Sequence, residues 1–507
     1  MTEIRYPFNL ITKYVIDNYH IDMNRSYEIC AIPARKLITY DRFDLMAKWM
    51  YIDGREKGLT SGSGCEVYYD NINAFSCGRF LEPGMGDKDS FEKYVHDLER
   101  MIEEVKGKGF DASKSLIPIG ENDVMVDGSH RVSTAAYYGK EVMAIRFPEL
   151  KRFNTYDYVY FRKYLMSDVS MGYMAIQYAR LKKNCYMACL WPRADADQIG
   201  EAESRLRTAG PIVYAQEVYL TYRGICNLMT QIYGHQAWTG SIENHFSGVN
   251  GKAEACYREG QPVRTYLFEA SDLDSVLEIK KQIRDIFQIE NHSIHISDNG
   301  DETTVMAELM YNRNSVDFMN RADPYQYSGV YNKLRELKSL IADNGYDKSR
   351  FIVDSSAVLE VCGLRQAADL DFLTDYVFEE KSQIEGVDDH KSQLPYYTVT
   401  LAQMLYDPAN YFYFEGMKFI TPQRLIEMKE KRGEAKDIRD VRMLRRYLKK
   451  KPGIPKEYRY ETIDQIHQYQ ISRRLYGEGA YSYKEYRQRV KRDRISKVVS
   501  MVKRPFR

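Results

Sequence analysis

Apolar residues follow a helical period in some stretches of the chain and a strand period in others. Residues 90–110 place apolar side chains at every third or fourth position, which predicts a strongly amphipathic helix. Residues 123–147 predict a strand, a tight turn, a helix that stops at Gly139, and a second strand. From 185 to 311, short apolar runs alternate with helical segments. This alternation predicts a largely parallel sheet.

The pattern changes near residue 325, where a helix precedes a strand–helix–strand unit, an aromatic strand and two basic helices. We therefore expect an α/β and α+β multidomain protein. The expected divisions are a leading helix at 1–24, an α/β domain at 25–150, a helical connector at 151–184, a middle parallel α/β unit at 185–324, a mixed-sheet domain with helices at 325–450, and a basic tail at 451–507.

Length and composition agree with several folded domains. The chain has 507 residues, of which 44% are hydrophobic, and a domain of ordinary size holds about 100–200 residues. The sequence contains no apolar run near the ~18–20 residues of a membrane-spanning helix, and its N-terminus lacks the order of a signal peptide. We therefore expect a cytoplasmic protein. The eight cysteines form no C-x-x-C pair, which disfavours a disulfide framework and a structural zinc site.

Charge is distributed unevenly along the chain. Residues 451–507 hold 15 Lys or Arg and 6 Asp or Glu, so their net charge is +9 and the other 450 residues carry −8. This disfavours a uniformly basic nucleic-acid-binding body. Within the tail, apolar residues recur on one side of a basic helix, which predicts peripheral contact with the anionic inner face of a membrane. Nucleic acid, an acidic partner and plain solvation are the alternatives.

A compact polar turn, Asp127–Arg131, lies between an apolar segment and a predicted helix. Backbone N–H groups at a helix start attract anions, and Gly128 lets a phosphate approach closely. Arg131 offers a forked donor to phosphate oxygens, and His130 can donate to phosphate or move a proton. Asp127 can hold a metal ion or act as a base. The predicted phosphate-binding residues are Asp127, Gly128, Ser129, His130 and Arg131.

The alternative for this turn is a structural Asp–Gly bend with Arg131 in a local ion pair. The segments IPARKLI and VMVDGSHRVSTAAYYGKEVMAIRF together resemble the ParB/sulfiredoxin-like fold over residues 25–150. That resemblance implies a domain that binds the phosphates of a nucleotide. No helix-turn-helix of the partition type follows the segment, which argues against a chromosome-partition role.

A second polar group surrounds Asp369 and Asp371, which flank Leu370 on a predicted strand. Residues i and i+2 of a strand share a face, and two carboxylates there repel each other unless a cation lies between them. We therefore predict that both hold Mg²⁺ or Mn²⁺, which binds substrate phosphates. Ser355 and Ser356 begin a predicted helix and are predicted to bind phosphates. A solvent-facing strand edge is the alternative.

Residues 325–450 resemble the nucleotidyltransferase fold of the polymerase-β-like superfamily. Ser355 matches that family's serine, and Asp369 and Asp371 match its acid pair. Glu415 matches the third acid, with Asp388 and Asp407 as alternatives.

The segment 429–444 matches the helical tail of the same family, so Lys429 and Lys436 are implied to offset phosphate charge. One residue departs from the pattern, because Asp354 stands where the family has glycine. An acid beside a triphosphate is repulsive unless it also binds metal. The resemblance implies catalytic roles for Asp369, Asp371 and Glu415.

Together these features predict a Mg²⁺- or Mn²⁺-dependent nucleotidyl- or phosphoryl-group transferase that binds a nucleotide or nucleotide-sugar. A weaker resemblance to surface-polysaccharide assembly proteins of bacteria implies a glycan or alditol acceptor. A ParB-like, nucleotide-switched nucleic-acid-binding regulator and a catalytically inactive scaffold are the alternatives.

Overall fold

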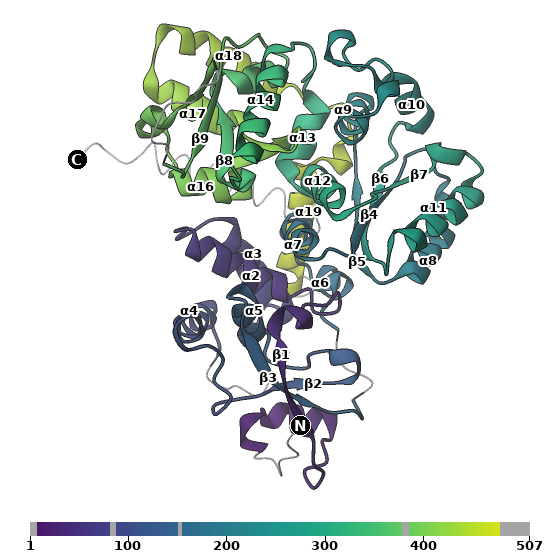
Figure 1. Ribbon diagram of the computed structural model, residues 1–507, viewed down its shortest axis with the longest axis vertical. Helices are drawn as coiled ribbons and strands as arrows, with labels where there is room; N and C mark the ends of the chain where they lie inside the picture. The colour runs from purple at the N-terminus through teal and green to yellow at the C-terminus, as the bar shows by residue number, and fades with distance from the viewer. Residues whose placement is uncertain (1–7, 82–87, 151–154, 378–384, 477–507) are drawn as a thin grey trace.

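The computed structural model describes residues 8–81, 88–150, 155–377 and 385–476. It shows the expected mixed α/β and α+β class, with three separate sheets and many helices (Figure 1). The far end of the predicted basic tail, residues 477–507, lies outside the described residues. Within the described part of the chain, every helix is too short or too polar to cross a lipid bilayer.

The N-terminal domain builds a three-stranded sheet in the order β1-β3-β2, where β1 and β3 are antiparallel and β3 and β2 are parallel. The amphipathic helix predicted at 90–110 is α4, which buries four apolar side chains on one face. The strands are β1 (Glu28–Pro33), β2 (Ile117–Ile119) and β3 (Glu141–Arg146). The helices are α1 (Lys13–Tyr19), α2 (Leu45–Glu56), α3 (Ser63–Phe75), α4 (Phe91–Lys108) and α5 (Ser129–Tyr137).

The middle domain has four strands in the order β5-β6-β4-β7, and every neighbouring pair is antiparallel. The prediction of a parallel unit is therefore wrong, although the alternation of strands and helices is confirmed. The strands are β4 (Cys185–Leu190), β5 (Ile212–Val218), β6 (Val263–Glu269) and β7 (Ile294–Ile296). The helices are α8 (Ile199–Ala209), α9 (Tyr222–Tyr233), α10 (Val249–Cys256), α11 (Leu273–Phe287), α12 (Gly300–Tyr311) and α13 (Arg313–Arg321).

The error has a topological cause. Helix α8 joins β4 to β5, but β6 lies between those two strands and runs in the opposite direction. Likewise α11 joins β6 to β7, and β4 lies between them. The domain is thus a split β-α-β arrangement, in which each crossover skips one strand.

The C-terminal domain holds a five-stranded mixed sheet in the order β10-β9-β8-β12-β11. Its strands are β8 (Phe351–Asp354), β9 (Leu370–Thr374), β10 (Val387–Asp389), β11 (Tyr411–Phe414) and β12 (Met417–Ile420). Its helices are α14 (Gly329–Asp343), α15 (Ser356–Val361), α16 (Leu401–Tyr406), α17 (Pro422–Arg432) and α18 (Ala435–Lys449). Strand β9 is antiparallel to β8 and parallel to β10.

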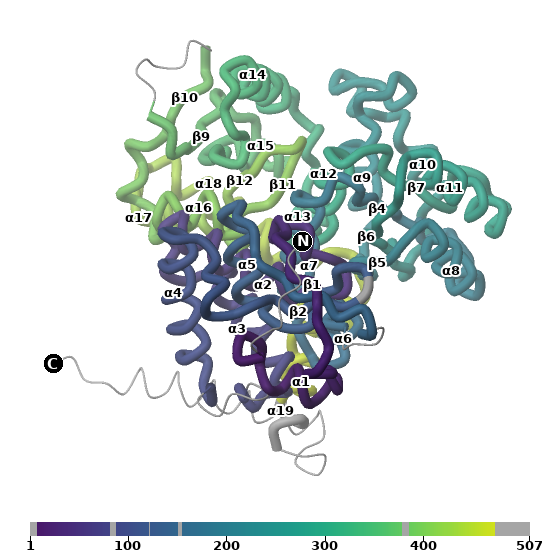
Figure 2. Tube along the Cα trace, turned by 60° about the horizontal axis from the view of Figure 1, so that its bottom comes forward, coloured from purple at the N-terminus to yellow at the C-terminus, as the bar shows by residue number. Residues whose placement is uncertain are grey.

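Two helices join the three domains. The predicted connector forms α6 (Tyr158–Lys163) and α7 (Asp168–Leu181), and α7 lies at the junction of the three lobes in both views (Figures 1 and 2). Arg180 of α7 donates to Glu308 Oε1 at 2.7 Å and to the Tyr413 hydroxyl at 2.6 Å. The start of the predicted tail returns to this junction as α19 (Tyr460–Tyr476). One continuous cluster of buried apolar side chains runs through all three domains.

Candidate functional site

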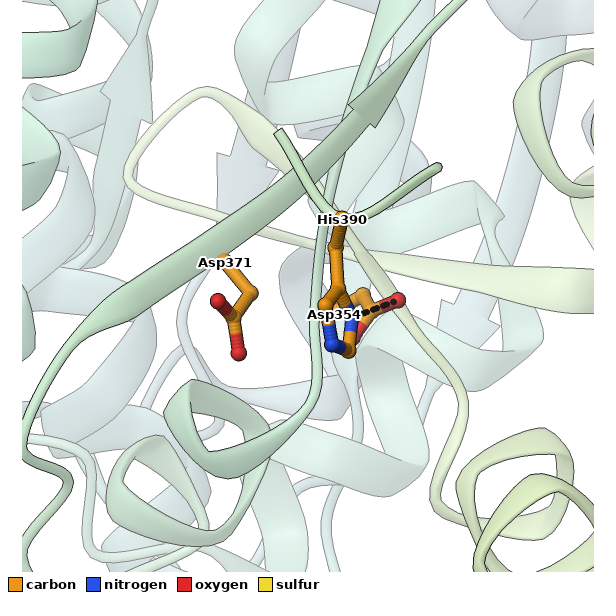
Figure 3. Close-up of side chains that lie close together, drawn as sticks. All are labelled: Asp354, Asp371 and His390. Atoms are coloured by element: carbon orange, nitrogen blue, oxygen red, sulfur yellow. Dashed lines mark hydrogen bonds and ion pairs between the residues drawn. The ribbon is translucent and has the colours of Figure 1, made fainter. Parts of the chain in front are cut away.

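Two aspartates and a histidine meet at one edge of the C-terminal sheet. Strand β8 ends at Asp354, and the antiparallel register places Asp371 of β9 directly beside it. His390 follows the last residue of β10. One potential ligand atom from each of the three side chains lies within 4.8 Å of the other two (Figure 3). This spacing is compatible with a single bound cation.

Asp354 is the most deeply buried member of this cluster, with no exposed surface. Its Oδ2 accepts from the Tyr397 hydroxyl at 2.7 Å, and both carboxylate oxygens lie 3.2 Å from His390 Nδ1. The residue that departs from the nucleotidyltransferase pattern is thus held by two donors. A buried charge is tolerated when such donors satisfy it.

The same contact controls the charge of His390. Burial alone would lower the pKa of this imidazole, but the hydrogen bond and negative charge of Asp354, with a smaller contribution from Asp371, raise it overall. The contact through Nδ1 also orients the ring. Among the described residues, Nε2 of His390 has no hydrogen-bond partner.

The side chain of Asp371 is half-buried, and its pKa lies well above that of an ordinary aspartate. Burial raises its pKa to about 6; the positive charge of His390 opposes this shift, whereas the carboxylates of Asp369 and Asp354 add to it. The hydroxyl of Ser355 also bonds to Asp371 and favours the charged form. A carboxylate that ionises near pH 6 can serve as a cation ligand or a proton acceptor.

The serine turn orders the same edge of the sheet. Ser355 has φ 59° and ψ −135°, a strained backbone conformation between β8 and α15. Ser356 Oγ donates to Asp369 Oδ1 at 3.1 Å. The two predicted phosphate-binding serines therefore contact the two predicted metal ligands.

Asp369 occupies a different position from the one expected of it. It precedes β9, which begins at Leu370, so it lies outside the strand on which a shared face with Asp371 was predicted. The three-residue cluster contains Asp354 and His390 in its place. Asp388, one of the alternative third acids, is the register partner of Asp371 on β10. Neighbouring strand partners share a face, so Asp388 extends the acidic row.

Glu415 lies far from this edge. It occupies the turn between β11 and β12, with φ 50°, and its carboxylate accepts from the Tyr325 hydroxyl at 2.7 Å. Phe419 of β12 pairs with Val353, so Glu415, in the turn before Met417, lies more than about 10 Å along the strand direction from the level of Asp354. The structure does not bring this predicted third acid to Asp371. The other alternative, Asp407, instead accepts from Ser63 of α3.

The two predicted phosphate-binding lysines also point elsewhere. Lys429 is buried between Asp437 Oδ1 at 3.0 Å and Asp440 Oδ2 at 2.9 Å. Lys436 is exposed on α18 and pairs with Glu434 at 3.1 Å. Lys429 therefore joins α17 to α18 through ion pairs and is not placed to meet a phosphate.

The Asp127–Arg131 turn lies in the N-terminal domain, on the wall of a cavity of about 550 Å³. Gly128 has φ 93°, which L side chains rarely adopt, and a Cβ there would lie 2.8 Å from Ile117 Cδ1, so a side chain at this position is disfavoured. Ser129 begins α5, and the first bond inside the helix runs from Val132 N to Gly128 O. The preceding N–H groups of the first turn remain available to a ligand.

Basic side chains outnumber acidic ones on the lining of this cavity, six against two, the acids being Asp97 and Asp127. Six basic side chains line it, and Arg42 and Lys48 are almost completely buried, paired with Asp44. The basic lining residues are Arg42, Lys48, Lys88, Arg100, Lys114 and Arg131. Tyr14, Tyr94 and Tyr156 also line the cavity. A pocket of this size and charge suits a phosphorylated ligand with an aromatic or sugar part.

Asp127 and His130 have defined partners in the turn. Asp127 accepts from Gly128 N at 2.7 Å, Thr12 Oγ1 at 3.3 Å and Arg131 Nη2 at 3.4 Å. His130 Nε2 lies 2.8 Å from the Tyr68 hydroxyl. Burial, with the charges of Lys48 and Lys88, lowers the pKa of His130 well below its ordinary value, so the imidazole is neutral at pH 7.

The sequence analysis identified the residues of each site that are neighbours along the chain. It missed the residues that reach the same site from distant segments. Thr12, Arg42 and Lys48 reach the N-terminal cavity from separate segments, and His390 and Tyr397 reach the C-terminal cluster in the same way. No short motif connects these residues. Comparison of the chain with models of protein families, with curated proteins and with solved structures finds no match.

Proposed function

We propose that the chain is a divalent-cation-dependent transferase of a nucleotidyl or phosphoryl group. The observation that carries this proposal is the convergence of Asp354, Asp371 and His390 at one sheet edge. Three side chains that offer ligand atoms this close together suit a cation better than a structural ion pair, since two of them are carboxylates. The serine turn and Asp369 complete the polar edge.

The donor set fits a divalent ion and indicates which one. Two carboxylate oxygens suit Mg²⁺ and Mn²⁺ alike, but an imidazole nitrogen suits Mn²⁺ better than Mg²⁺. Bound at this edge, such an ion would neutralise phosphate oxygens and orient the phosphate for attack. Asp354, Asp371 and His390 would hold it, and the contact of Asp354 with Nδ1 would also keep the imidazole in position.

The protein's own groups have clear tasks in this proposal. Asp354, which accepts a hydrogen bond from Tyr397, contacts His390 at Nδ1, and this leaves Nε2 to act as a ligand. Ser355 fixes the carboxylate of Asp371.

The N-terminal cavity supports the same class of chemistry from a second domain. Its six cations and the start of α5 suit the phosphates of a nucleotide or of a phosphorylated sugar. We infer that this domain holds a phosphorylated ligand, which agrees with the fold resemblance inferred from the sequence.

The proposal is tested by measuring Mn²⁺ binding to the full chain at pH 7.5 with isothermal titration calorimetry. We expect one site on the wild type and at least tenfold weaker binding for Asp371→Asn and His390→Gln. The control is Asp389→Asn, because Asp389 is the neighbouring surface acid on β10 and pairs with Lys391 at 3.1 Å. Unchanged Mn²⁺ affinity in both site variants would overturn the proposal.

The N-terminal ligand is tested separately with pyrophosphate and ATP in a thermal-shift titration without metal. Stabilisation should grow with ligand concentration as RT ln(1 + [L]/Kd) and should be lost in Arg131→Gln. Arg35→Gln is the control, because Arg35 donates to Ala136 O at the other end of α5. If neither phosphate compound stabilises the wild type, the cavity has another ligand class.

A further inference from the structure

Helix α18 presents a surface with charges of only one sign. Its two acidic residues, Asp437 and Asp440, are both buried and face inward. Six basic residues of the helix are exposed; the first, Lys436, pairs with Glu434, and the other five lie one to four positions apart on the outer face. We call these residues the α18 cationic stripe: Arg439, Arg442, Arg445, Arg446 and Lys449.

Most of the stripe has no counter-charge in the described chain. Arg445 pairs with Glu430 of α17. No ion pair forms between the other four residues and any described acid. Like charges three or four residues apart on a helix repel each other, so the stripe costs the isolated fold stability. An external polyanion would remove that repulsion.

The stripe borders a groove. A hollow of about 580 Å³ lies between α17 and α18, and four residues of the stripe line it. Val441 and Ile438 also line it, and Ile438 is 62% exposed. The groove therefore combines a short apolar floor with a lining in which the four stripe cations outnumber the two acids, Glu430 and Asp437.

We propose that this groove binds the phosphate backbone of a nucleic-acid strand. Charge complementarity favours a polyanion, and arginine forks match phosphate oxygens. From Arg439 to Lys449 the stripe extends about 15 Å along the helix, which spans several consecutive phosphates. A flat lipid surface would meet only the crest of α18 and leave the groove unfilled.

The lining also predicts how the strand is contacted. No aromatic side chain is among the described residues that line the groove, so bases have no stacking partner there. Contacts to phosphates carry no direct sequence information. Binding should therefore be independent of base sequence and strongly dependent on salt. The exposed Lys450 and Lys451 extend the same surface past the end of α18.

The inference is independent of the cation site, and its test needs no metal. The full chain is titrated against a fluorescein-labelled 20-nucleotide single-stranded DNA, and anisotropy is read from 50 to 200 mM NaCl. With about four phosphates neutralised, log K should fall with log [salt] at a slope near −3. Mixed-sequence and oligo-dT strands should bind equally.

The charge reversal Arg442→Glu with Arg446→Glu should weaken binding at least tenfold and make the salt slope shallower. The matched control is Arg205→Glu with Lys281→Glu, two exposed cations on α8 and α11 of the middle domain. Unchanged thermal midpoints show that the variants fold, and Arg442→Gln with Arg446→Gln should give an intermediate affinity.

Three results would overturn the inference. One is the absence of salt-dependent DNA binding by the wild type. Another is DNA binding that the groove variant leaves intact, which would place the contact in another basic segment. The third is tighter binding of polyglutamate or of phosphatidylserine vesicles than of DNA, with loss of that binding in the groove variant.

Discussion

At the scale of single residues, the C-terminal cluster depends on how one partner adjusts the ionisation of the next. Asp354 is buried, and Tyr397 and His390 satisfy its carboxylate oxygens. Its charge in turn raises the pKa of His390 and contributes to the raised pKa of Asp371. Replacement of any one member therefore changes the protonation of the others.

This coupling makes the stability of the protein depend on pH in a definite direction. The folded pKa of Asp371 is about 6, above the ordinary value of 3.8, so the folded state retains a proton that the unfolded state loses. Stability therefore falls as pH rises from about 4 to 6 and stays lower above that range. The raised pKa of His390 acts in the same direction, since its contribution is lost as pH rises through the folded value.

We predict that Asp371→Asn removes the contribution of Asp371 to the pH dependence of stability. The difference in melting temperature, variant minus wild type, should become more positive between pH 4 and pH 8, because the neutral amide avoids the cost of ionisation. Thermal unfolding in metal-free buffers at five pH values measures this difference. Ser392→Ala, at an exposed residue that carries no ionisable group, is the control and should give a flat difference. A flat difference for Asp371→Asn would contradict the assigned shift.

The sequence identified the members of this cluster that lie close together along the chain. Ser355, Ser356 and Asp371 stand out because a strand, a turn and a second strand follow one another. His390 and Tyr397 could not be found in this way, since only the pairing of β10 with β9 brings the first of them to Asp371. The departure at Asp354 was visible, but its two hydrogen-bond donors were not.

At the scale of elements, the pair α17 and α18 is held together by buried charges. Lys429 lies between Asp437 and Asp440, which also bind Arg432 at 2.7 Å and Arg365 at 2.8 Å. Although burial would raise it, the pKa of Asp437 is lowered to about 2 by Arg432 and Lys429. The sequence pattern of this segment predicted its two helices correctly. It did not show that the charged residues join the two helices through ion pairs, where the family resemblance implied contact with phosphate.

We therefore predict that Lys429→Met destabilises the fold by about 3 kcal/mol, because two buried carboxylates lose a shared cation. Urea unfolding followed by circular dichroism measures the loss. Lys436→Met is the matched control in the same segment: Lys436 has a 68% exposed side chain and pairs only with Glu434, so its removal should change stability by less than about 0.5 kcal/mol. If both substitutions change the free energy of unfolding by similarly small amounts, Lys429 is not a structural ion-pair residue and is again a candidate phosphate ligand.

The sequence predicted the positions of the helices better than the order and direction of the strands in the sheets. The middle domain has the predicted order of strands and helices, yet its sheet is antiparallel because each crossover skips a strand. Periodicity reports which residues are buried, whereas strand order is decided by how the faces of α8 and α11 pack on one side of the sheet. The same patterns fit both arrangements.

At the scale of the whole molecule, the two candidate phosphate sites belong to domains that contact each other directly. Asp407 accepts from Ser63 Oγ at 2.5 Å, across the boundary between the C-terminal domain and α3. Gly62 precedes this contact with φ +118°, and a Cβ there would lie 2.4 Å from Asp407 Oδ2. The close approach of the two domains thus requires glycine at this position.

We predict that Gly62→Ala weakens the contact between the two domains as well as the local backbone. The control is Gly58→Ala, because Gly58 has φ +78° but open space around it, so its cost of about 1 kcal/mol comes from the backbone alone. Gly62→Ala should cost about 1–3 kcal/mol more, from the clash with Asp407 and from a backbone conformation (φ 118°, ψ −166°) that alanine adopts less readily than that of Gly58. Differential scanning calorimetry should also show one transition in the control and a separated, earlier transition in Gly62→Ala, because domains that lose their contact unfold independently. Equal costs and a single transition in both variants would mean that the domains adjust around the new methyl group, and that the Ser63–Asp407 contact does not couple the N-terminal cavity to the cation site.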